Sequence, residues 1–225
     1  MIYRLAFAVC ICFLTVTTAV AGPWLREKGS SFTSFSLSAT ISRDAHSTSY
    51  LEFGITPTST VGLDIGFSRK NSGSKLAFGT LFLRRALGPT DKTNKFAYEV
   101  GIGATYGGPN REMSPHFKTG LSWGRGISVA GKGGWVTVDT AVLWDVNDSN
   151  HVTKVDSTIG LNFTDMTSGM IQLNFANQYN DTFGYFEPSL IFNPPTTDFR
   201  IQMGLITPLK EPSQTSFKLG LWREF

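Results

Sequence analysis

Cysteine, long apolar runs and a surplus of one charge are all scarce in this sequence of 225 residues. Both cysteines, Cys10 and Cys12, lie near the start. There, Arg4 precedes an apolar run that ends in Ala19-Val20-Ala21, a pattern that predicts a secretory signal peptide over 1–21. Once this signal is removed no thiol remains, so disulfides and thiolate metal sites are excluded.

The charge balance and the lengths of the apolar runs exclude two further classes. The chain has 20 Lys and Arg against 17 Asp and Glu, and loss of Arg4 with the signal lowers the net charge from +3 to +2. This surplus is too small for a nucleic-acid binder. Beyond the signal, no apolar stretch approaches the roughly 18 to 20 residues of a membrane helix. If this chain spans a membrane, it must therefore do so with strands.

From residue 31 onward, apolar and polar residues alternate in twelve segments of roughly ten residues, the length of a tilted membrane strand. The apolar positions cover 35–41, 51–55, 61–67, 75–84, 96–106, 117–123, 136–144, 155–163, 171–179, 186–192, 199–205 and 217–221. In 75–84 both parities are apolar, so the facing of that segment stays open. The pattern predicts an all-β fold, a closed antiparallel barrel of about twelve strands over 31–225, preceded by a short segment over 22–30.

Such alternation fits either a soluble sandwich or lipocalin-like barrel with its apolar face inward, or a membrane barrel with that face outward. Glycines such as Gly62, Gly101 and Gly103 fall repeatedly on the polar parity, which indicates a crowded, concave interior. Aromatic residues also gather near the segment ends, as in the two girdles of a membrane barrel. The expected girdles are Tyr50, Phe67, Tyr106, Trp144, Tyr179 and Tyr185 at one end, and Phe96, Trp123, Phe163, Phe192, Phe199 and Phe225 at the other. Both observations favour the membrane barrel.

The last strand carries a family resemblance. Its glycine at position 220 and terminal Phe225, together with the signal and the amphipathic strands, resemble small Gram-negative outer-membrane barrels. In that family the final strand is read by the barrel-assembly machinery, and Gly220 and Phe225 match this assembly signal. Trp222 stands one residue earlier than the family's usual aromatic. The resemblance implies an outer-membrane location, termini on the periplasmic side, and outer-membrane lipid and lipopolysaccharide as surroundings.

The polar parity supplies the residues expected to line the lumen. They are Glu52, Asp64, Glu99, Lys118, Asp139, Lys154, Asp156, Gln172, Asn174, Glu187, Arg200 and Lys218, with Gln178, Gln202 and Glu224 on the same parity. Because both signs are present, two alternatives stay open: a charge-paired interior that stiffens and plugs the barrel, or a hydrated pore whose charges set ion preference. The favoured function is a narrow channel or small-solute transporter for small solutes or ions. A structural or interaction barrel with a plugged lumen is one alternative.

A lipid-directed enzyme of the acylhydrolase type is the other alternative, and it needs a serine within reach of a histidine base. His46 directly precedes Ser47 in an expected outer loop, His116 follows Pro115, and His151 lies further along the chain. None matches the His-x-Ser-Asn pattern of barrel phospholipases, so no catalytic residue is predicted. The spacing of possible ligands is irregular, so no metal or other cofactor is predicted either.

Two smaller features complete the sequence-based expectations. Basic residues expected at the outer rim would suit lipopolysaccharide phosphates or form a plain solvated rim; they are Arg43, Arg69, Lys70 and Arg111. The segment 22–30 contains Trp24, which either anchors it in the periplasmic mouth of the barrel or leaves it mobile.

Overall fold

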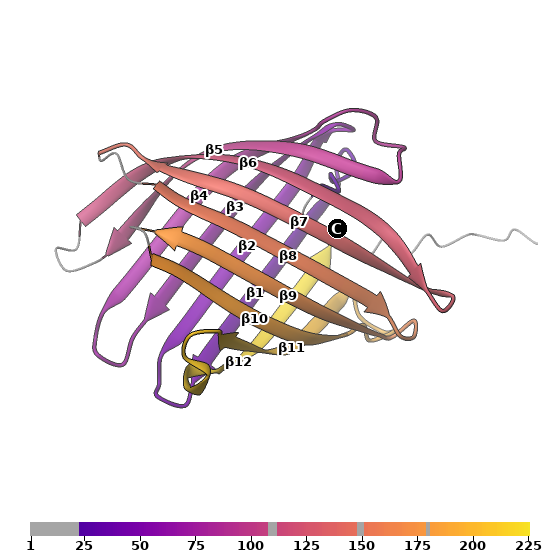
Figure 1. Ribbon diagram of the computed structural model, residues 1–225. Coiled ribbons are helices and arrows are strands. Elements are labelled where there is room, and N and C mark those ends of the chain that lie inside the picture. The colour runs from indigo at the N-terminus through magenta and orange to yellow at the C-terminus, as the bar shows by residue number, and fades with distance from the viewer. Residues whose placement is uncertain (1–22, 108–111, 148–150, 179–180) are drawn as a thin grey trace, which may run out of the picture.

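The computed structural model describes residues 23–107, 112–147, 151–178 and 181–225. The expected signal peptide, and the expectations for Arg111 and Tyr179, lie outside the described residues. Twelve tilted strands wrap into a barrel (Figure 1). They are β1 (Ser31–Thr40), β2 (Ala45–Thr56), β3 (Ser59–Arg69), β4 (Lys75–Ala86), β5 (Asn94–Gly107), β6 (Glu112–Val129), β7 (Lys132–Asp145), β8 (His151–Asn162), β9 (Thr167–Gln178), β10 (Asp181–Phe192), β11 (Phe199–Pro208) and β12 (Ser216–Glu224).

The barrel is closed by antiparallel pairing of β1 with β12, in register from Phe32 opposite Glu224 to Thr40 opposite Ser216. Every other strand pairs with its neighbour in sequence. Closure leaves no unpaired sheet edge, the condition for a sheet in hydrocarbon. The predicted twelve-strand antiparallel barrel is confirmed. The end at which β1 begins and β12 stops is called the terminal end, and the opposite end is called the loop end.

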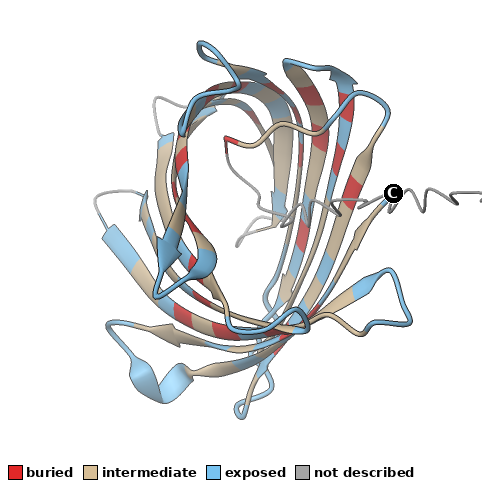
Figure 2. Ribbon diagram, turned by 90° about the vertical axis from the view of Figure 1, so that its right-hand side faces the viewer, coloured by how far each residue is buried: buried red, intermediate tan, exposed pale blue. Residues whose placement is uncertain are grey.

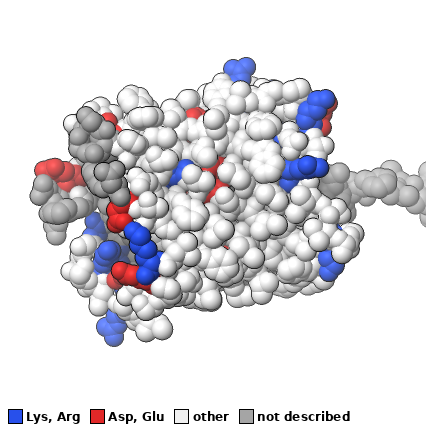
Figure 3. Space-filling view, viewed as in Figure 1, with Lys and Arg blue, Asp and Glu red and all other residues white. Residues whose placement is uncertain are grey.

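The apolar parity faces outward. Ile102 is 58% exposed, and Phe35 and Leu121 on other strands are likewise exposed, whereas Glu52 on the polar parity is 2% exposed. Buried residues recur along the strands that ring the interior (Figure 2). On the side shown in Figure 3, charged residues gather toward the two ends and few lie between them. The outer surface thus has the apolar band of a membrane barrel.

The structure settles the facing of β4. Thr80, Phe82 and Arg84 are buried on the inner face, while Leu81 and Leu83 are exposed on the outer face. The sequence left this facing open because Phe78 and Phe82 put apolar residues on the polar parity. Two large rings can be accommodated inside because the neighbouring strands carry glycine where the rings lie.

The prediction of two aromatic girdles is wrong for Tyr50 and Tyr185, which both lie on the inner face. Tyr50 hydrogen-bonds Glu52 at 2.7 Å and stacks on Phe82 with 5.6 Å between ring centroids. Tyr185 is the register partner of Asn174, which also faces inward. A tyrosine fits either face because its ring is apolar and its hydroxyl polar.

The connections are short, and the one between β11 and β12 contains a single 3₁₀ turn, η1 (Pro212–Gln214). Within the described residues, no helix has both the length and the apolar character to cross a membrane.

Candidate functional site

A chain of ion pairs begins on β6 and runs around the inner wall. The Lys118 ammonium lies 2.5 Å from Glu99, and Glu99 in turn lies 2.6 Å from the Arg84 guanidinium. Arg84 also pairs with Glu52, which lies on β2, two strands away. Arg84 additionally donates a hydrogen bond to Tyr50 at 3.0 Å. Three strands of wall are thereby joined through one buried guanidinium.

The chain continues through a residue that precedes the barrel. Arg26 lies 2.6 Å from Glu52 and 3.4 Å from Glu224 on β12, and Glu224 lies 3.3 Å from Arg200 on β11. Seven groups therefore alternate in sign: Lys118, Glu99, Arg84, Glu52, Arg26, Glu224 and Arg200. The Glu52 side chain is fully buried between two guanidiniums. A carboxylate in that position needs this pairing, since an unpaired buried charge is strongly destabilising.

The segment before β1, residues 23–30, is called the plug segment. In the end-on view of Figure 2 it lies within the ring of strands. Trp24 packs against a buried cluster on β7, β9 and β10, formed by Trp135, Met170 and Ile191. The Trp24 ring lies against Gly124, where an added Cβ would stand 2.5 Å from it. Arg26 also donates its backbone N–H to Thr60 at 3.0 Å. Of the two alternatives for the segment, mobile or anchored by Trp24, the structure agrees with anchoring by Trp24.

A second group of inner residues contains acidic side chains that do not belong to the ion-pair chain. Asp139 on β7 stands directly opposite Asp156 on β8, and Asp156 stands opposite Asn174 on β9. Among the described residues, Asp139 Oδ1 and Asn174 Oδ1 are buried without a hydrogen-bond donor. Lys154 is also on β8, with its ammonium 5.8 Å from the centre of the Phe78 ring. This part of the wall concentrates carboxylates that carry no close ion pair.

Polar contacts nearer β12 involve most of the remaining predicted lumen residues. Lys218 pairs with Glu187 at 3.1 Å, and Asn174 donates to the same carboxylate at 2.8 Å. Gln172 donates to Thr158 at 3.4 Å. Asp64 lies on the inner face of β3, opposite Tyr50. Four of the twelve predicted lumen residues, Glu52, Glu99, Lys118 and Arg200, thus belong to the ion-pair chain, and the other eight lie on the inner face outside it.

The histidines do not form one site. His46 was expected in an outer loop, but it lies within β2 on the inner face, opposite Ser38. The chain turns earlier than expected because Arg43 adopts a left-handed conformation with φ 70°. His116 is buried against Thr80 at 3.0 Å, and His151 stacks near Trp144 on the exposed surface. Within the described part of the chain, no group of three His, Cys, Asp or Glu is placed to hold a metal ion.

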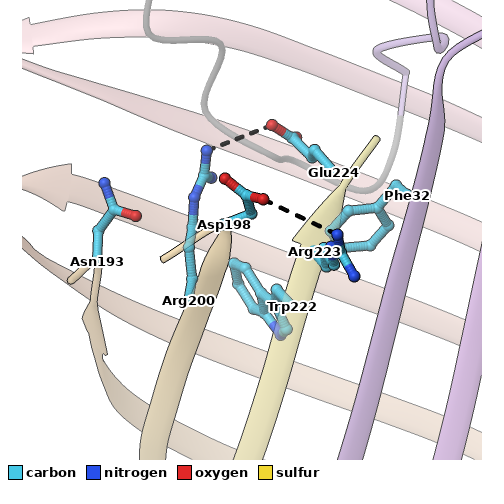
Figure 4. A pocket seen from close by; sticks show the side chains of 7 residues that line it. All are labelled: Phe32, Asn193, Asp198, Arg200, Trp222, Arg223 and Glu224. Atoms are coloured by element: carbon cyan, nitrogen blue, oxygen red, sulfur yellow. Dashed lines mark hydrogen bonds and ion pairs between the residues drawn. The ribbon is translucent and has the colours of Figure 1, made fainter. Parts of the chain in front are cut away.

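A cavity of about 210 Å³ opens at the terminal end. Figure 4 shows its lining side chains, which come from the start of β1, the β10–β11 connection, β11 and the end of β12. Arg200 and Glu224 pair across it. The cavity therefore borders the last link of the ion-pair chain, where the lumen meets solvent at the terminal end.

Sequence reasoning missed three members of the site: Arg26, Tyr50 and Arg84. The adjacent Arg84 and Arg85 gave no parity signal, because one must face in and the other out. Arg26 lies before the first alternating segment, where periodicity gives no information. The one available signal was the repeated glycine on the polar parity, which marks where large inner groups lie against the wall.

No family model matches this sequence, and no curated protein matches it. Among solved structures, the barrel is similar to the KdgM porin, with a TM-score of 0.60 and 7% identity over 86% of this chain and 99% of that one. A KdgM porin in complex with disordered oligogalacturonate gives 0.56 at 8% identity, over 87% and 99% of the chains. The COG4313 outer membrane channel from Pseudomonas putida F1 gives 0.56 at 13% identity, over 92% and 100%.

These similarities concern the fold. The chain has the fold of Gram-negative outer-membrane β-barrels, and the similarity extends over nearly the whole of these two proteins.

Proposed function

We propose that this protein is a narrow outer-membrane channel for small polar solutes or ions, held in a closed state by its plug segment. The observation that carries the proposal is the charged inner wall behind an apolar outer surface. Ionised groups lie along the interior from Lys118 to Arg200, and charged side chains that line a pore are one means by which channels select ions. The similarity in fold to two channel proteins supports the same function.

The plug segment supplies the closed state in this proposal. Its described part is held by Trp24 against Gly124 and by Arg26 between Glu52 and Glu224. Glu52 retains Arg84, and Glu224 retains Arg200, when Arg26 leaves. Withdrawal of the segment therefore leaves no isolated buried carboxylate, so an open state is electrostatically accessible.

A structural barrel with a permanently plugged lumen is the second candidate. The continuous ion-pair chain favours it, because such a network stiffens the wall and fills part of the interior.

The channel proposal also suggests a class of solute. One solved porin of this fold is in complex with disordered oligogalacturonate, an acidic sugar chain. In the channel proposal, the lumen cations Lys118, Lys154 and Lys218 would contact anionic solutes of that general kind.

Planar-bilayer conductance separates the two candidates. The protein should give small, rare openings, and deletion of residues 22–28 should increase both conductance and open time. Lys28→Ala is the matched control, since Lys28 is exposed in the same segment. Folding is checked by the difference in gel migration before and after boiling. A correctly folded barrel that stays silent with and without the segment would favour the structural candidate.

Two partners belong to the same proposal. Exposed Arg43, Arg69 and Lys70 at the loop end would contact lipopolysaccharide phosphates. Gly220 and Phe225 would present the last strand to the barrel-assembly machinery. Replacement of Phe225 by Ser should lower the amount of barrel inserted into outer membranes, and normal insertion would count against this role.

A further inference from the structure

One arginine faces the outer surface close to the terminal end. Arg223 alternates with Leu219 and Leu221 on β12, and both leucines are exposed on the outer face. Its guanidinium carbon lies 4.2 Å from the centre of the Phe225 ring and 4.9 Å from that of Phe199. The two aromatic rings hold the cation in one place by cation–π contact.

A groove of about 270 Å³ leads away from this guanidinium along the outer face of β1, β2, β11 and β12. Its walls include Phe35, Leu51, Phe199 and Leu221, while the smaller Thr33 and Ser49 lie among them. Thr33 stands opposite both Leu51 and Arg223 in register. The small side chains leave a hollow between larger ones in the apolar band, with the cation at its end.

A carboxylate lies beside the cation. Asp198, in the connection between β10 and β11, is 3.8 Å from Arg223 Nη2, which is an ion pair longer than a hydrogen bond (Figure 4). The Asp198 side chain is 80% exposed. Arg223 Nε is buried and meets no hydrogen-bond acceptor in the part of the chain that the structure describes. A cation with a donor to spare and an exposed anion therefore stand next to each other at the edge of the apolar band.

We propose that this site binds one glycerophospholipid with a zwitterionic, primary-amine headgroup. The lipid phosphate binds Arg223, the ammonium group binds Asp198, and an acyl chain lies in the groove. Charge complementarity selects this class: the phosphate and amine of the headgroup are paired by a neighbouring cation and anion. A headgroup with negative charge alone would meet repulsion from Asp198. With the termini on the periplasmic side, the lipid would belong to the inner leaflet.

The test measures lipid retention by native mass spectrometry of the refolded protein in detergent, with equal amounts of phosphatidylethanolamine and phosphatidylglycerol. The protein should retain one phosphatidylethanolamine in preference. Arg223→Gln should weaken that retention about tenfold, the loss expected for one charge-assisted contact. Arg85→Gln is the matched control, because Arg85 is exposed on the outer face of β4 near the same end. It should leave retention unchanged.

Asp198→Asn tests the second half of the site. It should abolish the preference for phosphatidylethanolamine over phosphatidylglycerol, and because Asp198 is exposed the variant should fold. Equal retention of both lipids by the unaltered protein would overturn the proposal. So would unchanged retention in folded Arg223→Gln, an equal loss in Arg85→Gln, or an unchanged preference in Asp198→Asn. The site lies outside the lumen, so these results are independent of conductance.

Discussion

Arg84 on β4 forms an ion pair with Glu52 on β2 across the intervening strand β3. The side chains can meet because both point into a concave surface, where next-nearest strands converge. The same guanidinium lies 2.6 Å from Glu99 and its carbon 5.1 Å from the centre of the Phe82 ring. Arg84 is therefore the cation shared by the two buried glutamates of this wall, and each of them has a second cation, Arg26 for Glu52 and Lys118 for Glu99.

Replacement of Arg84 by Ala should destabilise the barrel by about 1–3 kcal/mol, because two buried carboxylates each lose one of their two cation partners. Urea unfolding in lipid vesicles would measure the loss. Arg85→Ala, on the outer face of the same strand, should change stability much less. Equal midpoints for both variants would mean that Glu52 and Glu99 are neutralised in another way.

Ile102→Lys should cost roughly 2–4 kcal/mol, since it places an ammonium group in the apolar band. Ile102 is among the most exposed apolar residues of the outer face. The same change at Thr158, on the inner face of β8, should cost less because Asp156 lies two residues away on that face. The reverse order of unfolding midpoints in vesicles would contradict the outward facing of Ile102.

Gly124→Val should open the channel by displacing the plug segment. The new side chain would occupy the space of the Trp24 ring, 2.5 Å from the added Cβ. Gly126→Val is a matched control on the same strand, because an added Cβ there meets no described atom within 4 Å. Single-channel recording should show more frequent openings for the first variant only. Identical currents for both variants would mean that the contact of Trp24 with Gly124 does not control opening of the channel.

Conversion of Asp139 and Asp156 to Asn should shift ion selectivity toward anions. The two carboxylates stand directly opposite each other, so their removal also relieves like-charge repulsion and should not weaken the barrel. The shift would be read from the reversal potential in a salt gradient. Asp165→Asn, in the exposed turn after β8, should leave that potential unchanged. An unshifted double variant would place the ion path elsewhere.

The fold was accessible from the sequence because a barrel wall obeys a period of two. Residues such as Ile102 and Leu121 repeat the same preference along each strand, and twelve such segments reinforce one another. The facing of β4 could not be predicted in this way, because Phe78 and Phe82 place apolar rings on the inner face as well. The inward position of Tyr50 was not predicted, because tyrosine suits both a membrane interface and a polar interior.

The site was less accessible, since it depends on contacts between residues far apart in sequence. Glu52, Glu99 and Lys118 could be placed on the inner face, but their partner Arg84 could not. Arg26 reaches Glu224 over a separation of 198 residues, and no local pattern signals such a contact. The repeated glycines pointed to a crowded interior, yet only the structure shows that Trp24 fills the space at Gly124.

The position of Arg26 also constrains the order in which the molecule can be built. Its two carboxylate partners lie on β2 and β12, the two strands that pair with β1. The first partner is available as soon as the early hairpins form, whereas the second arrives with the final nine residues of strand. Arg26 can therefore bind both carboxylates only after β12 has paired with β1. The contact between Arg26 and Glu224 therefore forms when the barrel closes, so closure of the barrel and fixing of the plug segment inside it occur in the same step.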